Sequence, residues 1–210
     1  MLIKIKDLYK TFNINIIGIL HIGAHNCEEL EAYISVGIDK DDIYWVEGQE
    51  NLVKKMKDKG IKNIFHALID EEDDKEVIFN ISNNGQSSSL LEFGTHSKNH
   101  PEVKYVSKSR CKTIRLDTLI EKKNIPIKKL NFLNIDIQGL ELRALKSIEK
   151  YLLNIDYIYT EVNIEEVYKH CAKIEEIDEY LNKFGFIRVD VKIYKQCGWG
   201  DAFYMRNINN

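Results

Sequence analysis

The chain has 210 residues, of which 44% are hydrophobic and 30% are charged, and its formal net charge is -3 at pH 7. This length and balance predict one globular domain over residues 1–210 with a full hydrophobic core. The slightly acidic charge favours no nucleic-acid partner. No run approaches the roughly 18 apolar residues of a membrane span, and the N-terminal segment lacks the apolar core of a signal peptide.

The four cysteines are scattered along the chain and form no C-x-x-C pair. Such a pattern is typical of free thiols in a reducing compartment, so we expect a cytoplasmic protein. The oligomeric state is left open by the sequence. The cysteines are Cys27, Cys111, Cys171 and Cys197.

An almost continuous apolar run at residues 16–22 ends at Gly23. It predicts a strand buried on both faces, as in a parallel sheet. Asn26 then stands at a helix-capping position with Glu29 three residues later, which predicts a capping box and a helix. Gly37 is placed to end that helix in a left-handed turn.

The same unit of strand and helix recurs along the chain, which predicts an α/β fold with a doubly wound sheet and right-handed crossovers. Helices are expected around Leu52–Met56, after Asp136 and at residues 174–184. Further strands are expected at residues 43–47, 64–68, 130–136 and 157–162, with two closing strands at 186–191 and 202–206.

The alternation of strand and helix is interrupted between the third strand and Leu130. Residues 77–82 and 111–116 have the pattern of strands, and a polar loop at residues 83–101 lies between them. Long polar loops inside compact domains are often functional. We therefore predict an insertion at about residues 76–116, close to the ligand.

His21 and His25 are four residues apart, the spacing at which a helix offers two imidazoles to zinc. Here the first histidine belongs to a predicted strand, and Gly23 separates the two rings. No metal site is predicted from this pair. His21 is either a core histidine or a cofactor contact, whereas His25 lies on the turn, nearer to a ligand.

A cofactor site explains the same turn better. Ligands of open α/β sheets bind beyond the carboxyl ends of the strands, and an acidic residue about 20 positions after the glycine turn binds ribose hydroxyls. Glu47 ends the second predicted strand, 24 residues after Gly23 (47 − 23). The G-x-G-x-x-G pattern is incomplete, and Glu28 stands where a pyrophosphate would be repelled. This favours S-adenosylmethionine over NAD and leaves an NAD-dependent sugar oxidoreductase as the alternative.

The sequence resembles the FkbM-type S-adenosylmethionine-dependent methyltransferases from about residue 16 to residue 206. The most distinctive part is the Asp-x-Gln-Gly-x-Glu segment that begins at Asp136. The chain departs from the family pattern at His21, Cys27 and Asn134. The matching stretches are HIGAHNCEELEAY, IYWVEGQ, IRLDTLI, FLNIDIQGLELRALKSIEKYL, YIYTEVN and GFIRVD…WGDAFYMR.

The resemblance implies a Rossmann-like class I methyltransferase fold. Its sheet would have seven mostly parallel strands, helices on both faces and a C-terminal antiparallel hairpin. It also implies O-methylation of a sugar hydroxyl, on a deoxysugar of the rhamnose or fucose type or on a glycan. The variant with H-I-G-A-H and two glutamates is similar to the branch associated with glycan synthesis. A non-catalytic module of a glycan-synthesis complex is the other alternative.

The cofactor is expected to lie along the first three strand ends. Glu47 would bind the ribose, Asp70 would meet the adenine amino group, and Ala67 and Leu68 would flank the adenine ring. Glu28 would face the positive end of the cofactor. The expected cofactor contacts are His21, Gly23, Ala24, His25, Asn26, Glu28, Glu47, Gly48, Ala67, Leu68, Asp70, Ser88 and Asp136.

Asp136, at the carboxyl end of the fourth core strand, is the first candidate for the catalytic base. Glu161 ends the next strand, so the two acids could act as base and orienting group or hold a divalent cation. Glu141 either caps the following helix or joins the site. His96 and His100 are alternative bases on the polar loop. The expected acceptor contacts are Gln86, Gln138, Asn163 and Trp199, the last by stacking on a sugar face.

Overall fold

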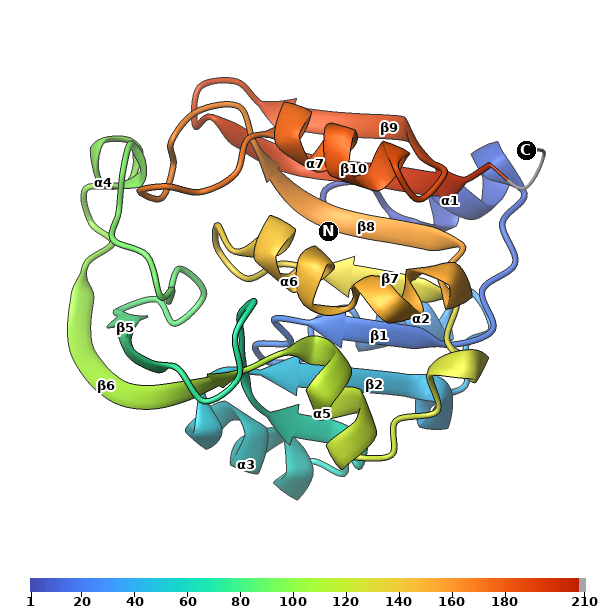
Figure 1. The fold of residues 1–210 in the computed structure, drawn as a ribbon, viewed down its shortest axis with the longest axis horizontal. Helices are drawn as coiled ribbons and strands as arrows, with labels where there is room; N and C mark the ends of the chain where they lie inside the picture. The colour runs from blue at the N-terminus through green and yellow to red at the C-terminus, as the bar shows by residue number, and fades with distance from the viewer. Residues whose placement is uncertain (208–210) are drawn as a thin grey trace.

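Seven strands form the central sheet in the order β3-β2-β1-β7-β8-β10-β9 (Figure 1). The computed structural model describes residues 1–207. Neighbouring strands are parallel from β3 to β8, and β10 is antiparallel to both β8 and β9. The predicted α/β class with its C-terminal antiparallel hairpin is confirmed. The strands are β1 (Ile19–Ile22), β2 (Ile43–Glu47), β3 (Ile64–His66), β7 (Phe132–Ile135), β8 (Tyr157–Asn163), β9 (Phe186–Tyr194) and β10 (Trp199–Arg206).

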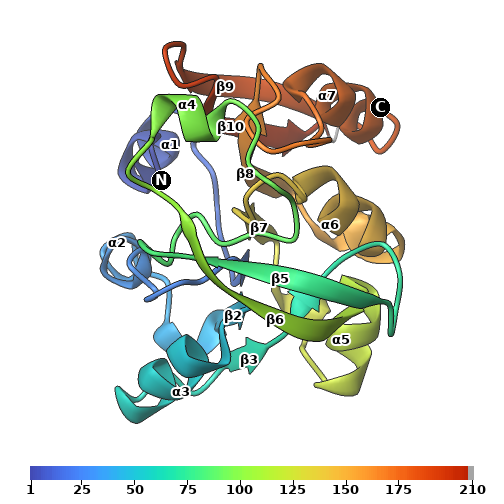
Figure 2. The same cartoon turned by 90° about the vertical axis from the view of Figure 1, so that its left-hand side faces the viewer.

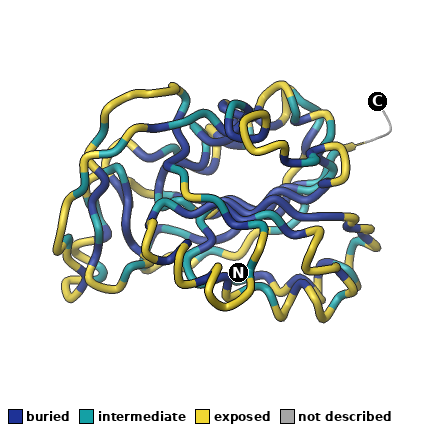
Figure 3. The backbone as a smooth tube through the Cα atoms, turned by 90° about the horizontal axis from the view of Figure 1, so that it is seen from below, coloured by how far each residue is buried: buried dark blue, intermediate teal, exposed yellow. Residues whose placement is uncertain are grey.

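Helices cover both faces of this sheet, and Figure 3 shows the buried strands between partly exposed layers. Leu8, Tyr33 and Met56, from α1, α2 and α3, pack on one face with Trp45 and Phe132. No helix of residues 1–207 is long and apolar enough to cross a membrane. The helices are α1 (Ile5–Phe12), α2 (Leu30–Ile34), α3 (Glu50–Asp58), α4 (His96–Asn99), α5 (Leu116–Lys122), α6 (Glu141–Ser147) and α7 (Ile174–Asn182), with short 3-10 turns η1 (Lys40–Asp42), η2 (Ile127–Lys129) and η3 (Glu149–Asn154).

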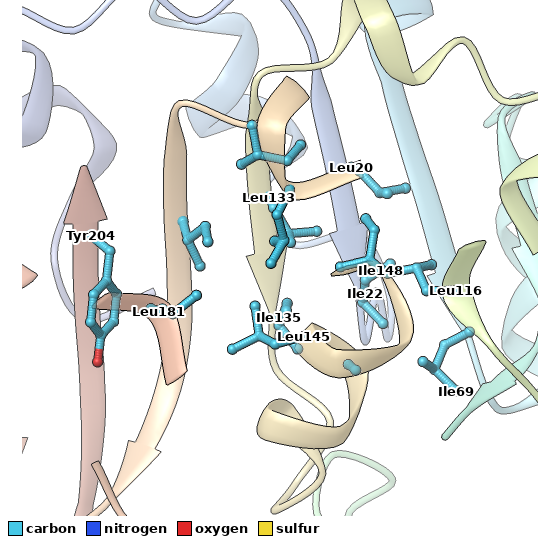
Figure 4. Close-up of a cluster of buried hydrophobic side chains, with 14 of the residues drawn as sticks. Leu20, Ile22, Ile69, Leu116, Leu133, Ile135, Leu145, Ile148, Leu181 and Tyr204 are labelled. Atoms are coloured by element: carbon cyan, nitrogen blue, oxygen red, sulfur yellow. The ribbon is translucent and has the colours of Figure 1, made fainter. Parts of the chain in front are cut away.

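The opposite face of the sheet carries the larger hydrophobic core. Helices α5, α6 and α7 cover it, and Figure 4 shows Leu133 and Ile135 of β7 packed beside Leu145 of α6. All three side chains are fully buried. Each such burial stabilises the fold by roughly 1.5 to 3 kcal/mol before entropy is counted. Because β1 and β7 are buried on both faces, their sequences are almost continuously apolar, as a central parallel strand requires.

A second, three-stranded sheet lies beyond the carboxyl ends of the parallel strands (Figures 1 and 2). Its order is β4-β6-β5, with β5 and β6 antiparallel. The expected strand at 111–116 is the end of a longer strand that starts at Tyr105, and Leu116 already begins α5. The predicted third strand is divided at Ala67, since Leu68 and Ile69 leave β3 to pair with β6. The strands are β4 (Leu68–Ile69), β5 (Glu76–Ser82) and β6 (Tyr105–Ile114).

The predicted capping box at Asn26 is wrong. Helix α2 begins only at Leu30, and Cys27 adopts a positive φ of 54° that a helix cannot accommodate. The Asn26 amide N–H donates instead to Glu28 Oε2 at 3.1 Å. Glu29, the expected partner, forms no side-chain cap of α2. Local turn chemistry therefore replaced the helical cap that the spacing of the two residues suggested.

Gly23 is required where the ends of β1 and β7 meet. Its φ is +90°, and a Cβ atom there would lie 1.7 Å from the carbonyl oxygen of Asp136. The glycine thus allows backbone to approach backbone, rather than only a ligand to approach the turn. Its own N–H donates to Val46 O at 2.9 Å, which ties the turn to β2 as well.

Gly23→Ala should lower the free energy of unfolding by about 3 kcal/mol or more, because a clash is added to an unfavourable φ. The matched control is Gly37→Ala, at a φ of +92° with no atom within 4 Å of the added Cβ. That variant should lose only about 1 to 2 kcal/mol. Urea unfolding of both proteins measures the difference, and equal losses would show that the contact with Asp136 is not restrictive.

Candidate functional site

A cavity of about 460 Å³ opens between the carboxyl ends of the parallel strands and the segment that carries the second sheet. It reaches from Gly48 and Leu68, beside β2 and β3, past the β1 turn to Asp136 and Trp199. Its size is that of an ordinary small-molecule site. Its position is the one at which open α/β sheets bind ligands.

The charge of this cavity is one-sided. Seven carboxylate side chains line it, whereas no lysine or arginine among residues 1–207 does. Four histidines are the nearest basic side chains. The cavity therefore favours a ligand that brings positive charge.

Glu47 is held by the backbone at the end of β2. Its Oε2 accepts the His25 N–H and its Oε1 accepts the Gln49 N–H, each at 2.7 Å. The carboxyl is buried at 6% exposure, and burial raises its pKa against the opposing effect of these hydrogen bonds. Each carboxylate oxygen retains a lone pair, so the group can still accept from a ligand on the cavity side.

The glycine turn after β1 presents His25 and Glu28 to the cavity. His25 Nδ1 and Glu28 Oε1 are 2.6 Å apart, and His25 has a positive φ of 44°. Partial burial acts to raise the pKa of Glu28, but His25 and the backbone N–H groups of Glu28 and Asn26 together outweigh it, so the pKa is lowered. Glu28 thus remains an anion at the mouth of the cofactor turn.

Asp136 and Glu161 stand side by side at the ends of β7 and β8. Gln138 joins them, since its Nε2 donates to Asp136 Oδ1 at 2.6 Å and to Glu161 Oε2 at 3.1 Å. The Tyr168 hydroxyl donates to Gln138 Oε1 at 2.6 Å and fixes the amide. The sequence predicted that the two acids would face one pocket, and the structure brings them together.

Glu141 lies at the start of α6 beneath this pair. Its Oε1 accepts the N–H groups of Ile137 and Gly139 at 3.1 and 3.0 Å. One oxygen each of Asp136, Glu141 and Glu161 lies within 4.8 Å of the other two. Glu141 therefore joins the acidic group, and it accepts from the turn before α6 rather than capping that helix.

The environment makes these acids hard to ionise together. Burial of its carboxyl group and the negative charge of Asp201 together raise the pKa of Asp136 to about 6. Burial also raises the pKa of Glu141 to about 7 and that of Glu161 well above its usual range. Asp136 itself is open to the cavity, whereas Glu161 is 6% exposed. Perturbed carboxyl groups in a cleft are typical of functional sites.

The polar loop expected near the ligand does close over the cavity. Gln49 Nε2 donates to Gly85 O at 3.0 Å, and Ser89 Oγ donates to Gln138 O at 2.7 Å. Ser88 Oγ is directed inside the loop, donating to Gly85 O at 2.7 Å. Gln86 and Ser88 line the cavity from this loop. The loop thereby connects the β2 end of the site with the β7 end.

His21 is a buried core histidine, although its strand also borders the cavity. Its Nδ1 lies 3.1 Å from the Tyr33 hydroxyl, and its ring packs on Trp45 at 4.8 Å between centroids. Asn134 Nδ2 donates to the same hydroxyl at 2.7 Å. Burial lowers the pKa of His21 to about 4, so the ring is neutral.

His96 belongs to an aromatic wall at the acceptor end of the cavity. Its ring stacks on Phe93 at 4.4 Å and lies 5.4 Å from Tyr168. Burial lowers its pKa to about 4, and its Nδ1 is buried without a partner in the described chain. A base works best with a pKa near the operating pH, so His96 is a poor candidate for that role.

Most of the predicted site residues line this one cavity, but four do not. Asp70 does not line this cavity, and its Oδ2 lies 3.5 Å from Arg143 Nη1. Asn26 accepts from Lys55 Nζ at 2.8 Å. Ala24 and Asn163 are buried behind the surface. The predicted direct contacts of these four residues are not supported.

Asp201 and Tyr168 belong to the site but were missed from the sequence. Asp201 is 5% exposed, lines the cavity, and accepts from the Leu2 N–H at 2.6 Å and from the Tyr159 hydroxyl. Its signal was an acid directly before the apolar run that starts at residue 202. Tyr168 had no such signal, because it follows β8 in an irregular segment.

The sheet order, the glycine turn and the acidic cavity at the strand ends define an S-adenosylmethionine-dependent methyltransferase fold. The family model of the methyltransferase FkbM domain matches residues 21–188, so this chain belongs to that family. Membership confirms the resemblance and, with it, the expected cofactor S-adenosylmethionine. No curated protein matches the sequence.

Several solved structures have a similar fold. The putative tRNA (m1A22) methyltransferase Sp1610 of Streptococcus pneumoniae has a TM-score of 0.50 at 14% identity, over 99% of this chain and 71% of that chain. TrmK of M. capricolum, in complex with S-adenosyl-homocysteine, has a TM-score of 0.50 at 10% identity, with 99% and 70% covered. A SAM dependent methyltransferase from Aquifex aeolicus has a TM-score of 0.47 at 15% identity, with 98% and 91% covered.

The exclusion of nucleic acid as a partner is contradicted. The fold of this chain is shared by a protein described as a putative tRNA methyltransferase. Net charge was a poor basis for the exclusion, because the local arrangement of charges decides which ligands a surface attracts. A net charge of -3 says nothing of that arrangement.

His96 gives the fold a sensitivity to acid. Its imidazole is protonated near pH 6.5 in the unfolded chain but only near pH 4 in the folded one, so its contribution to stability is full above pH 6.5 and is lost as the pH falls toward 4. His96→Phe keeps a ring beside Phe93. Between pH 7 and pH 5, the free energy of unfolding should fall by about 1 to 2 kcal/mol less in this variant than in the wild type. Urea unfolding at both pH values measures this, and parallel losses would contradict it.

Proposed function

We propose that this protein transfers a methyl group from S-adenosylmethionine to a hydroxyl group of a sugar, on a deoxysugar or a glycan. The observation that carries the proposal is the pair of carboxyl groups of Asp136 and Glu161, joined by Gln138 at the cavity floor. A hydroxyl acceptor needs a group that removes its proton, and these are the acids best placed to do so.

The cavity fits the cofactor in charge and in layout. The reactive end of S-adenosylmethionine carries a sulfonium and an ammonium group, and the cavity has seven acids and, in the described chain, no lysine or arginine. Glu47, fixed by two amides at the end of β2, is suited to the ribose hydroxyls. Gly48 and Leu68 would border the adenine, since both line the same end of the cavity.

When bound, S-adenosylmethionine supplies a methyl group whose bond to S⁺ breaks with its electron pair remaining on sulfur. The chain must hold the acceptor oxygen about 3 Å from that carbon and in line with the breaking bond. The Asp136 carboxylate then takes the hydroxyl proton as the new O–C bond forms. Gln138 keeps that carboxylate oriented through its 2.6 Å hydrogen bond. Glu161 does not have to take up a proton in this step.

The acceptor would lie against the wall formed by the polar loop and the aromatic side chains. Trp199 lines the cavity, with its ring 5.4 Å from Tyr194, and offers a face to the C–H surface of a sugar. Gln86 and Gln138 supply neutral donors and acceptors nearby. The family membership of the chain favours this acceptor class over the alternative of an NAD-dependent oxidoreductase.

The free thiols of Cys27, Cys111, Cys171 and Cys197 support a cytoplasmic location, which we propose together with the function. We likewise propose that residues 1–210 act as one methyltransferase domain, with the β5–β6 sheet and its loop as part of the site. The cavity is lined from the main sheet and from this segment alike, which supports that view.

Glu47→Gln should weaken the binding of S-adenosylhomocysteine by at least about tenfold, because a neutral amide cannot accept from two amides and two ribose hydroxyls at once. Isothermal titration calorimetry measures this. The control is Glu102→Gln, an exposed acid at the far end of the same cavity, which should bind as the wild type does. An absence of any binding by the wild type would rule out the proposed cofactor site.

Asp136→Asn should retain S-adenosylhomocysteine binding but lose about 100-fold or more in turnover, since proton removal contributes that much to transfer. A labelled-methyl assay over nucleotide sugars and short glycans measures turnover. The control is Asp58→Asn, at an exposed position of α3 outside the cavity, and it should keep the wild-type activity. If the cofactor binds but the whole panel accepts no methyl, the chain acts as a non-catalytic module or on another class of acceptor.

A further inference from the structure

A proton acceptor needs one carboxyl group, whereas three acids meet at the cavity floor. Asp136 directly follows β7, Glu141 begins α6 and Glu161 lies in β8, and one oxygen of each lies within 4.8 Å of the other two. Ions such as Mg²⁺, Mn²⁺ and Ca²⁺ bind oxygens at about 2.0 to 2.6 Å, which places two ligands at most about 4 to 5 Å apart. The spacing of the three oxygens is within the span of a Ca²⁺ shell, and Mg²⁺ or Mn²⁺, whose ligands lie at most about 4 Å apart, would draw the three side chains slightly closer.

A buried amide without a partner lies beside this group. Asn163 is 0% exposed, and neither its Oδ1 nor its Nδ2 has a hydrogen-bond partner in the described chain. A buried polar side chain in that state costs about 1 to 3 kcal/mol, so it calls for an explanation. A ligand bound nearby would give this amide a hydrogen-bond partner.

The strand register shows where the Asn163 side chain is directed. Asn163 lies two residues after Glu161 on β8, so both side chains leave the same face of the strand. Across the ladder they pair with Trp199 and Asp201, whose side chains share that face. Trp199, Asp201 and Glu161 all line the cavity. The amide of Asn163 is therefore directed toward the acidic group from beneath it.

We propose that Asp136, Glu141 and Glu161 bind a divalent cation, with Asn163 as a further oxygen donor reached through a water on the ion. Mg²⁺ and Mn²⁺ suit such a site, because Mg²⁺ keeps several of its waters and takes carboxylate oxygens. Two carboxylates on adjacent strands and one on a helix hold the ion from three sides. No lysine or arginine of residues 1–207 lines the cavity, and the Met1 ammonium there is paired with Glu29 at 3.3 Å.

Gln138 can serve the same ion without a change of backbone. Its amide lies between Asp136 and Glu161, and Tyr168 is its other partner. A tyrosine hydroxyl accepts as readily as it donates, so the amide can turn and direct its oxygen to the ion while its NH₂ donates to Tyr168. The ion would then stand beside the oxygen of the acceptor, which deepens the proposed function and rests on it.

The test is a titration of the metal-stripped full-length protein with Mn²⁺ at pH 7.5, without cofactor, with free Mn²⁺ followed by electron paramagnetic resonance. We expect one ion per chain. Glu141→Gln and Glu161→Gln should weaken binding by about tenfold or more, and the distant Glu102→Gln should not. A wild type that binds no Mn²⁺, or equal affinities in all four proteins, would overturn the proposal.

The Asn163→Leu variant tests whether the Asn163 amide serves the bound ion or only the fold. Thermal unfolding shows whether each variant is folded. The leucine removes a buried unpaired amide, so the melting temperature without metal should rise, whereas Mn²⁺ affinity should fall by several-fold. Unchanged affinity would overturn the role of Asn163.

A separate titration with S-adenosylhomocysteine distinguishes the two proposals. If the cofactor binds but Mn²⁺ does not, the cation site is overturned and the methyltransferase function stands. Displacement of Mn²⁺ by S-adenosylhomocysteine would assign the acids to the cofactor and overturn the cation site.

Discussion

The register of three parallel strands is the constraint on which the site depends. Ile22 pairs with Ile135, and Ile135 pairs with Thr160, so the next residue of each strand arrives at the same edge. Those residues are Gly23, Asp136 and Glu161. The approach of Gly23 to the Asp136 carbonyl holds the first two strand ends together, and Gln138 joins the second to the third. A slip of one residue would turn each of these side chains to the other face of the sheet.

The same edge concentrates negative charge, which the protein stabilises mainly by backbone groups, with the Met1 ammonium 3.3 Å from Glu29 Oε1 as a cation beside it. Glu47 accepts two amides, Glu141 accepts two, and Asp201 accepts one amide and a tyrosine hydroxyl. Fixed N–H dipoles hold a carboxylate in place but do not neutralise it. The positive charge that would neutralise these acids comes from a ligand. This need links the architecture to the cofactor and to the proposed cation site.

The second sheet completes the site from the other side. Its polar loop bonds to Gln49 near β2 and to Gln138 after β7, and the aromatic wall around Phe93 and Tyr168 closes the acceptor end. Gly85 leaves little room for a side chain, because His25 Nε2 lies 3.2 Å from where a Cβ would be. Cofactor turn and loop are thus packed against each other, so a change in one is felt at both ends of the cavity.

The sequence by itself determined the sheet, the cofactor turn and the pair of acids, because short apolar runs that alternate with helices indicate buried parallel strands, whose carboxyl ends meet at one edge. It could not determine the cap of α2, where the positive φ of Cys27 overrides the spacing of Asn26 and Glu29. It also could not show that Asp70 pairs with Arg143, that His21 belongs to the core, or that Asp201 and Tyr168 join the site. Those outcomes depend on contacts between residues far apart in the chain, and only the tertiary structure decided them.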